Sequence, residues 1–279
     1  MILRSIETEV RISAAESYHE KMISVSVIGC GHMGKALLEG LATGGEYRTI
    51  GYDVNPTVLA GVESYCNQTT TDTDAIVDSD IAVLTVKPEI VPTVLAEIDL
   101  RAEQTLVTAA AGVERSFVSN RTDATVVRLM PNLAASLSEM AAAVAWDEPD
   151  PNVETMLADL GSYVVINEAQ MNVATALNGS GPAFVYYLIQ AMQTRAVNEG
   201  LDRSDAQTLA IQTFIGAAKM VRAADESIES LIDAVCSPNG TTIEGMNVLF
   251  DSDVDTEIGD ALTAATDRSA ELAAEVDHE

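Results

Sequence analysis

The sequence predicts an α/β fold, in which an N-terminal domain with a parallel β-sheet is followed by an all-helical C-terminal domain. Short segments rich in β-branched residues alternate with helical segments between residues 24 and 166, which is typical of a parallel sheet with helices on both faces. Beyond residue 167 the apolar residues recur only at helical spacing. A length of 279 residues also suits two domains better than one.

The elements of the first domain follow from this pattern in order. Strands are predicted over residues 24–28, 49–53, 81–86, 105–110, 125–130, 141–146 and 163–166, where β-branched or small apolar residues gather. Helices are predicted over 34–42, after Pro56 and over 153–160. Breakers that include Pro88, Gly112 and Pro131 follow the strand ends.

The second domain is predicted to hold helices over 183–198, 204–223, 228–235, 242–250 and 256–274. The change of period places a domain boundary at residue 167, so the domains span 22–167 and 168–279. These helices carry more apolar residues than one small core can bury. Residues 1–21 are charged and lack an apolar signal core, and Met22 directly precedes the first strand. We therefore interpret them as a disordered leader or a mis-assigned start.

The composition is strongly acidic, with a net charge of −28. The acidic residues are spread along the chain instead of forming one tail, so nucleic acids and anionic membranes would be repelled. We therefore expect neither as a partner. A cytoplasmic enzyme of a halophile fits best, because high salt screens the self-repulsion of such a surface.

The cysteines and histidines do not form a recognisable site. No two of the three cysteines (Cys30, Cys66 and Cys236) form a CxxC pair, and the three histidines are scattered along the sequence. We therefore expect neither a disulfide framework nor a metal site. No apolar run of about 18 residues exists to span a bilayer. These features favour a reducing cytoplasm.

Residues 29–34 (GCGHMG) form a GxGxxG motif between the first predicted strand and the first predicted helix. Asp53 ends the second strand, about 20 residues after the glycine motif. In dinucleotide-binding folds an acidic residue at this sequence separation accepts a hydrogen bond from the ribose. The motif therefore predicts a Rossmann-type nucleotide site with the pyrophosphate at the helix N-terminus. The alternative is a glycine-rich turn that binds no nucleotide. The residues expected to contact the cofactor here are Ile28, Gly29, Cys30, Gly31, His32, Met33 and Gly34.

Residues 236–242 (CSPNGTT) form a second candidate site. Asn239 and Gly240 reach positive φ easily, so a tight turn is expected before the helix over 242–250. The free N–H groups at the start of that helix can bind a small anion such as a carboxylate. An ordinary helix cap is the alternative reading.

Three motifs together resemble the pyrroline-5-carboxylate reductase family, whose members make L-proline. They are 178–184 (NGSGPAF), 212–220 (QTFIGAAKM) and 236–242 (CSPNGTT), and the resemblance extends from residue 22 to 274. The resemblance implies hydride transfer from NADPH or NADH to 1-pyrroline-5-carboxylate, and a homodimer interlocked through the helical domains. The chain departs from the usual motifs at Leu133-Ala134, at Phe184 and at Asn239, where Thr-Pro, tyrosine and glycine are common.

The resemblance also assigns residues to the cofactor. Two loops at strand ends would cover its nicotinamide half, namely Thr85, Val86, Lys87 and Pro88, and Ala109, Ala110 and Ala111 before Gly112. At the ribose, Asp53 favours NADH, whereas Asn55 and Asp72 align with residues near the 2′-phosphate in relatives that use NADPH. We expect use of both cofactors, with NADH not strongly disfavoured. Arg128 and Asn132 could support either the sheet edge or the site.

The substrate side is assigned to the second candidate turn. The resemblance implies that Gly240, Thr241 and Thr242 donate backbone N–H groups to the substrate carboxylate, and that the Thr242 hydroxyl meets the ring nitrogen as the catalytic contact. Ser237 would line the same pocket, and Asp225 stands where relatives carry an acid. For Gly179, Gly181 and Pro182 we expect close helix packing without ligand contact.

Two other functions remain possible on the sequence. One is a hydroxy-acid dehydrogenase of the related two-domain superfamily, for which Lys219 would be the only lysine in the helical domain that could serve as acid or base. The other is a catalytically silent paralogue that binds nucleotide as a sensor. The intact turn at 236–242 argues against the second.

Overall fold

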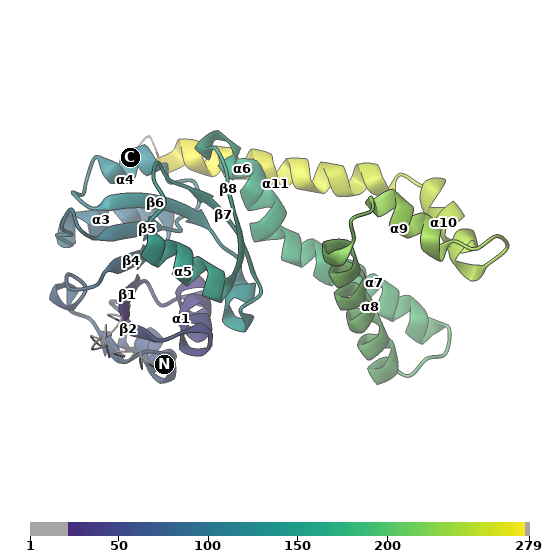
Figure 1. Cartoon of the computed structure of the whole chain (residues 1–279), viewed down its shortest axis with the longest axis horizontal. Helices are drawn as coiled ribbons and strands as arrows, with labels where there is room; N and C mark the ends of the chain where they lie inside the picture. The colour runs from purple at the N-terminus through teal and green to yellow at the C-terminus, as the bar shows by residue number, and fades with distance from the viewer. Residues whose placement is uncertain (1–21, 277–279) are drawn as a thin grey trace, which may run out of the picture.

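The structure is a computed structural model that describes residues 22–276 of the chain, so the leader predicted over residues 1–21 lies outside the described residues. An eight-stranded sheet with the order β3-β2-β1-β4-β5-β6-β7-β8 forms the N-terminal part (Figure 1). Its strands are β1 (Ile23–Ile28), β2 (Tyr47–Tyr52), β3 (Gln68–Thr70), β4 (Ile81–Leu84), β5 (Thr105–Thr108), β6 (Thr125–Met130), β7 (Met140–Ala145) and β8 (Gly161–Val165).

The helices of this part cover both faces of the sheet. They are α1 (His32–Gly44), α2 (Pro56–Ala60), α3 (Val91–Glu97), α4 (Arg115–Ser119) and α5 (Pro151–Leu160), with short 3-10 segments Glu63–Tyr65, Thr73–Ala75, Pro88–Ile90 and Leu133–Leu137 between them. Alternate strand residues point to opposite faces: Val25 and Val83 pack with α1 and α5, whereas Ile28 and Leu84 pack with α3 and α4. The predicted fold class is confirmed.

Two features of the sheet differ from the prediction. β3 was not predicted, because its three polar residues at an edge carry no apolar signal. β7 runs antiparallel to β6, with Leu129 opposite Val144, whereas a parallel sheet was expected throughout. Residues 131–139 explain the reversal, because this short connection contains only a 3-10 turn and cannot carry the chain back across the sheet.

The C-terminal part begins with a 3-10 turn (Glu168–Gln170), α6 (Met171–Ala174) and a π-helical segment (Thr175–Ser180). It continues as α7 (Gly181–Asn198), α8 (Arg203–Ala223), α9 (Ile228–Val235), α10 (Thr241–Phe250) and α11 (Val254–Val276). Helices α7 to α10 form an arm that projects away from the sheet, and α11 returns from the tip of the arm to the sheet (Figure 1). The switch from strands to helices after residue 167 agrees with the sequence pattern.

Many apolar side chains of the arm are exposed in the single chain. The exposed set includes Val185, Tyr186, Tyr187, Met192, Leu209, Ile211, Ile215, Met220, Val221, Ile228, Val235, Val248, Leu249 and Phe250. So many exposed apolar side chains on one arm are unusual for a monomer and indicate a surface that another protein surface covers.

Candidate active site

The glycine-rich loop connects β1 to α1 at the carboxyl edge of the sheet. Gly29 has φ +94°, and a Cβ at this position would collide with Val86, so only glycine fits here. α1 begins at His32, and Gly31 before it makes no side-chain cap, so the first N–H groups of the helix are free. A Cβ at Gly31 would meet no described atom within 4 Å, which leaves open space before the helix. A nucleotide pyrophosphate fits this space and these donors.

Cys30 of this loop is buried and carries no nucleophilic chemistry. Burial, and after it the charge of Asp53 and the thiol of Cys66, raise the pKa of the Cys30 thiol to about 12. The thiol is therefore neutral at physiological pH. Its backbone N–H instead holds Asp53 in place, because Cys30 N donates to Asp53 Oδ2 at 2.9 Å.

The residues assigned to the ribose lie together at the ends of β2 and β3. Asp53 also accepts from Asn55 N at 2.9 Å, and Asn55 caps α2 by accepting from Thr57 N at 3.0 Å. Asp72 caps the next 3-10 turn by accepting from Asp74 N at 3.1 Å. The two carboxylates therefore flank one edge of the sheet next to the glycine-rich loop.

The loops assigned to the nicotinamide end at the same edge. Thr85 Oγ1 donates to Gly29 O at 2.6 Å, which ties the loop after β4 to the glycine-rich loop. Pro88 begins a 3-10 turn, and Lys87 before it is exposed. The loop with Ala109, Ala110 and Ala111 follows β5. The structure thus brings the sequence-predicted cofactor residues to one edge, where ligands of open α/β sheets bind.

The second candidate turn has the predicted geometry. Asn239 adopts φ +57°, and Gly240 N donates to Ser237 O at 3.0 Å. Helix α10 begins at Thr241, and Gly240 before it makes no side-chain cap, so the leading N–H groups are free. The turn lies between α9 and α10 at the far end of the arm, distant from the glycine-rich loop (Figure 1). One chain does not bring the two candidate sites together.

Asp225 is exposed in the connection between α8 and α9, also on the arm. Gly181 shows no close packing, because a Cβ there would meet no described atom within 4 Å, and a Cβ at Gly179 would meet only ordinary contacts at 3.8 Å. The close packing expected at these glycines is therefore absent from the described residues of the single chain. Gly181 and Pro182 instead line a pocket of about 710 Å³ between β7, β8, α7 and α11.

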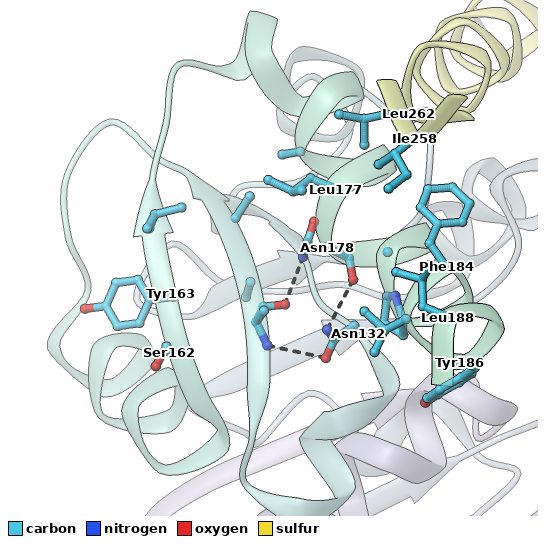
Figure 2. Close-up of a pocket in the computed structure, with 18 residues that line it drawn as sticks. Asn132, Ser162, Tyr163, Leu177, Asn178, Phe184, Tyr186, Leu188, Ile258 and Leu262 are labelled. Atoms are coloured by element: carbon cyan, nitrogen blue, oxygen red, sulfur yellow. Dashed lines mark hydrogen bonds between the residues drawn. The ribbon is translucent and has the colours of Figure 1, made fainter. Parts of the chain in front are cut away.

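An asparagine pair joins the sheet to the arm beside this pocket (Figure 2). Asn132 Nδ2 donates to Asn178 O at 3.1 Å, while Asn178 Nδ2 donates to Met130 O at 2.7 Å and to Ala141 O at 2.8 Å. Asn178 lies in the π-helical segment, in which the widened turn brings both its carbonyl and its side chain to the sheet. Asn132 thus supports the junction, which was one of the two roles considered for it.

Arg128 has the same kind of role, and the partner that reveals it is Glu168, which the sequence did not indicate. The Arg128 guanidinium is buried and donates to Glu168 Oε1 at 2.8 Å. Arg115 N donates to the same oxygen at 2.7 Å. Glu168 opens the C-terminal part, so this network ties α4 and β6 to the root of the arm. No local sequence signal could have found it, because the three residues are 53, 40 and 13 positions apart.

Substitutions at two glycines of the loop should separate packing from ligand binding. A Cβ at Gly34 would collide with Gly29 O and Thr85 Oγ1, so we expect Gly34→Ala to cost about 1–3 kcal/mol of unfolding free energy and to weaken dinucleotide binding. Gly31→Ala should leave the melting temperature unchanged and weaken binding alone. Thermal melts and calorimetric titration with NAD⁺ measure both. Undiminished NAD⁺ affinity in Gly31→Ala would contradict the placement of the pyrophosphate.

Asn178→Ala removes the two donors to Met130 O and Ala141 O. Because these carbonyls lose a hydrogen bond at a partly buried junction, we expect a loss of about 1–3 kcal/mol of unfolding free energy and a fall in melting temperature of about 2–10 °C. Asn120→Ala is the matched control, since Asn120 is exposed at the end of α4. Equal melting temperatures for the two variants would show that the junction does not depend on Asn178.

Comparison with known proteins identifies the family. A pyrroline-5-carboxylate reductase of Methanosarcina acetivorans is 37% identical over 265 residues, which cover 89% of this chain and 97% of the relative. This chain belongs to the pyrroline-5-carboxylate reductase family. The pyrroline-5-carboxylate reductase of Escherichia coli is 32% identical over 262 residues, with 89% of this chain and 97% of the relative covered.

Family models and solved structures agree with this assignment. Residues 168–272 match the model for pyrroline-5-carboxylate reductase dimerisation, and residues 24–112 match the model for NADP oxidoreductase, coenzyme F420-dependent. A Plasmodium falciparum pyrroline carboxylate reductase structure with NADP bound has a TM-score of 0.79 at 25% identity, covering 91% of this chain and all of that one. The reductase structure from Coxiella burnetii gives 0.78 at 28% identity, covering 90% and 99%.

Within the described residues, no helix is long and apolar enough to cross a membrane. The same part of the chain contains no group of three or more His, Cys, Asp or Glu side chains that could hold a metal ion.

Proposed function

We propose that this chain reduces 1-pyrroline-5-carboxylate to L-proline with NADH or NADPH. The observation that carries the proposal is the pairing of an open dinucleotide cradle with an uncapped α10 turn in a member of the pyrroline-5-carboxylate reductase family. The cofactor supplies the hydride. The protein must hold the imine next to it in a dry pocket and stabilise the ring nitrogen.

The residues of the chain divide this work between two surfaces. The glycine-rich loop and the loops after β4 and β5 hold the dinucleotide at the sheet edge. The N–H groups of Gly240, Thr241 and Thr242 bind the substrate carboxylate, because a helix N-terminus favours an anion. The Thr242 hydroxyl can form a hydrogen bond with the ring nitrogen, since it makes no hydrogen bond within the described part of the chain. Ser237 and Asp225 are the other side chains that we expect to border the bound substrate.

We propose that the complete site forms only in the homodimer. The α10 turn lies far from the cofactor loops of its own chain, and the arm exposes an apolar surface that another chain can cover (Figure 1). The match of residues 168–272 to a dimerisation model supports pairing through the arm. In the dimer, the turn of one subunit can meet the sheet edge of its partner. We also propose a cytoplasmic location and operation at high salt, which the net charge of −28 supports.

The decisive experiment is oxidation of NADH and NADPH with 1-pyrroline-5-carboxylate in molar KCl, with proline identified as the product. Proline formation supports the proposal. Oxidoreductase activity confined to hydroxy acids would instead support the dehydrogenase alternative, in which case Lys219→Ala should abolish it. Nucleotide binding without turnover on either substrate class would support the silent paralogue.

A further inference from the structure

The ribose end of the proposed cofactor site is formed by the carboxyl ends of β2 and β3. Asp53 directly follows β2, and Asp72 lies two residues beyond β3. The two strands pair in parallel with Tyr52 beside Thr70, and Asp53 N donates to Thr70 O at 3.3 Å. Both carboxylates therefore belong to one edge of the sheet, next to the loop that holds the pyrophosphate.

The Asp53 carboxylate is fixed in place by two backbone donors. Cys30 N donates to Oδ2 and Asn55 N donates to Oδ1, each at 2.9 Å. Rotation of the carboxylate away from an approaching nucleotide would break both charge-assisted hydrogen bonds. Each oxygen keeps accepting capacity, so a ribose hydroxyl can still donate to it.

Among residues 22–276, the carboxyl ends of β2 and β3 and the loops that follow them carry no basic side chain. Between Arg48 and Lys87 the sequence contains no lysine or arginine, but it contains the acidic residues Asp53, Glu63, Asp72, Asp74, Asp78 and Asp80. Lys35 of α1 is directed elsewhere, since its Nζ lies 3.8 Å from Glu39 Oε1 and 5.8 Å from the centre of the Tyr65 ring. Burial raises the pKa of the Tyr52 phenol, and the charges of Glu97, Asp53 and Asp72 raise it further. This second contribution reflects the negative potential at the edge.

We propose that this chain prefers NADH and discriminates against NADPH, with Asp53 and Asp72 as the residues that determine the preference. The inference rests on the proposed function. A 2′-phosphate carries about −1.5 to −2 charges at pH 7, and here it would face a fixed carboxylate with no cation from the surrounding strands to neutralise it. The 2′-hydroxyl of NADH instead donates a hydrogen bond to Asp53.

The test compares both cofactors on the full-length enzyme. We expect kcat/KM to favour NADH by about tenfold or more, and by a larger factor in 0.2 M than in 2 M KCl because salt screens the repulsion. Asp53→Asn and Asp72→Asn should each lower the preference about fivefold, mainly through a lower KM for NADPH. Asp78→Asn is the matched control and should leave the ratio unchanged. Asp78 is exposed and precedes the amino end of β4, whereas the cofactor loops follow the carboxyl ends of the strands.

Calorimetric titration with NAD⁺ and NADP⁺ provides a readout that does not depend on turnover. Tighter binding of NAD⁺, lost in Asp53→Asn, supports the inference even if no proline is formed, in which case only the proposed function fails. The inference would be overturned if the wild-type enzyme used NADPH as well as or better than NADH and bound NADP⁺ as tightly as or more tightly than NAD⁺. An unchanged ratio in both Asp53→Asn and Asp72→Asn would also overturn it.

Discussion

Thr242→Val is expected to lower kcat by about 10- to 100-fold, equivalent to about 1.4–2.7 kcal/mol, with little change in cofactor affinity. The hydroxyl is proposed to bond the ring nitrogen as charge shifts during hydride transfer, so the contact is stronger in the transition state than in the ground state. Valine keeps the shape of the side chain and the backbone N–H while removing the hydroxyl. Steady-state kinetics with saturating cofactor measure the effect.

Thr241→Val is the matched control, because only the backbone amide of Thr241 is proposed to act. The alternative for Thr242 is that it caps the helix. The geometry already disfavours this, since α10 begins at Thr241 and Gly240 occupies the cap position. If Thr242 had a purely structural role, Thr242→Val would lower the melting temperature while kcat at saturation survived. An unimpaired kcat would exclude the catalytic role.

The melting temperature is expected to rise with KCl concentration, by on the order of 10 °C between 0.1 and 2 M. The net charge of −28 is distributed over the chain, and the exposed carboxylates far outnumber the basic side chains that could pair with them. The Debye length falls from about 10 Å at 0.1 M salt to about 3 Å at 1 M, so the repulsion that opposes compaction is largely removed. Activity should decline together with structure below roughly molar salt.

Thermal melts across a KCl series test this expectation. Repeating the series near pH 5 is an internal control, because partial protonation of the carboxylates lowers the net charge and should weaken the dependence on salt. Sucrose carries no charge and does not screen the carboxylates. A sucrose series of matched osmolality should therefore not reproduce the rise in melting temperature that low concentrations of KCl produce. A melting temperature indifferent to KCl would show that charge repulsion does not limit the stability of this protein.

The sequence by itself determined the features that depend on local pattern. Strand periodicity, the GxGxxG loop with Asp53, and the Asn239 turn before α10 are encoded within a few residues, because pleat alternation and access to positive φ are local properties. The strand over residues 125–130 and the helix over 228–235 were predicted with the bounds that the structure has. The same motifs were sufficient to indicate the family.

The tertiary structure decided what depends on residues distant in the sequence. The antiparallel pairing of β7 with β6, the polar edge strand β3, and the Glu168 network with Arg115 and Arg128 have no local signature. The separation of Thr242 from the glycine-rich loop belongs to the same class, since it arises from the arm of α7 to α10 projecting away from the sheet (Figure 1). Local patterns specify which surfaces a chain must bury, but only the packing of the whole chain determines which surfaces meet and which remain for a second subunit.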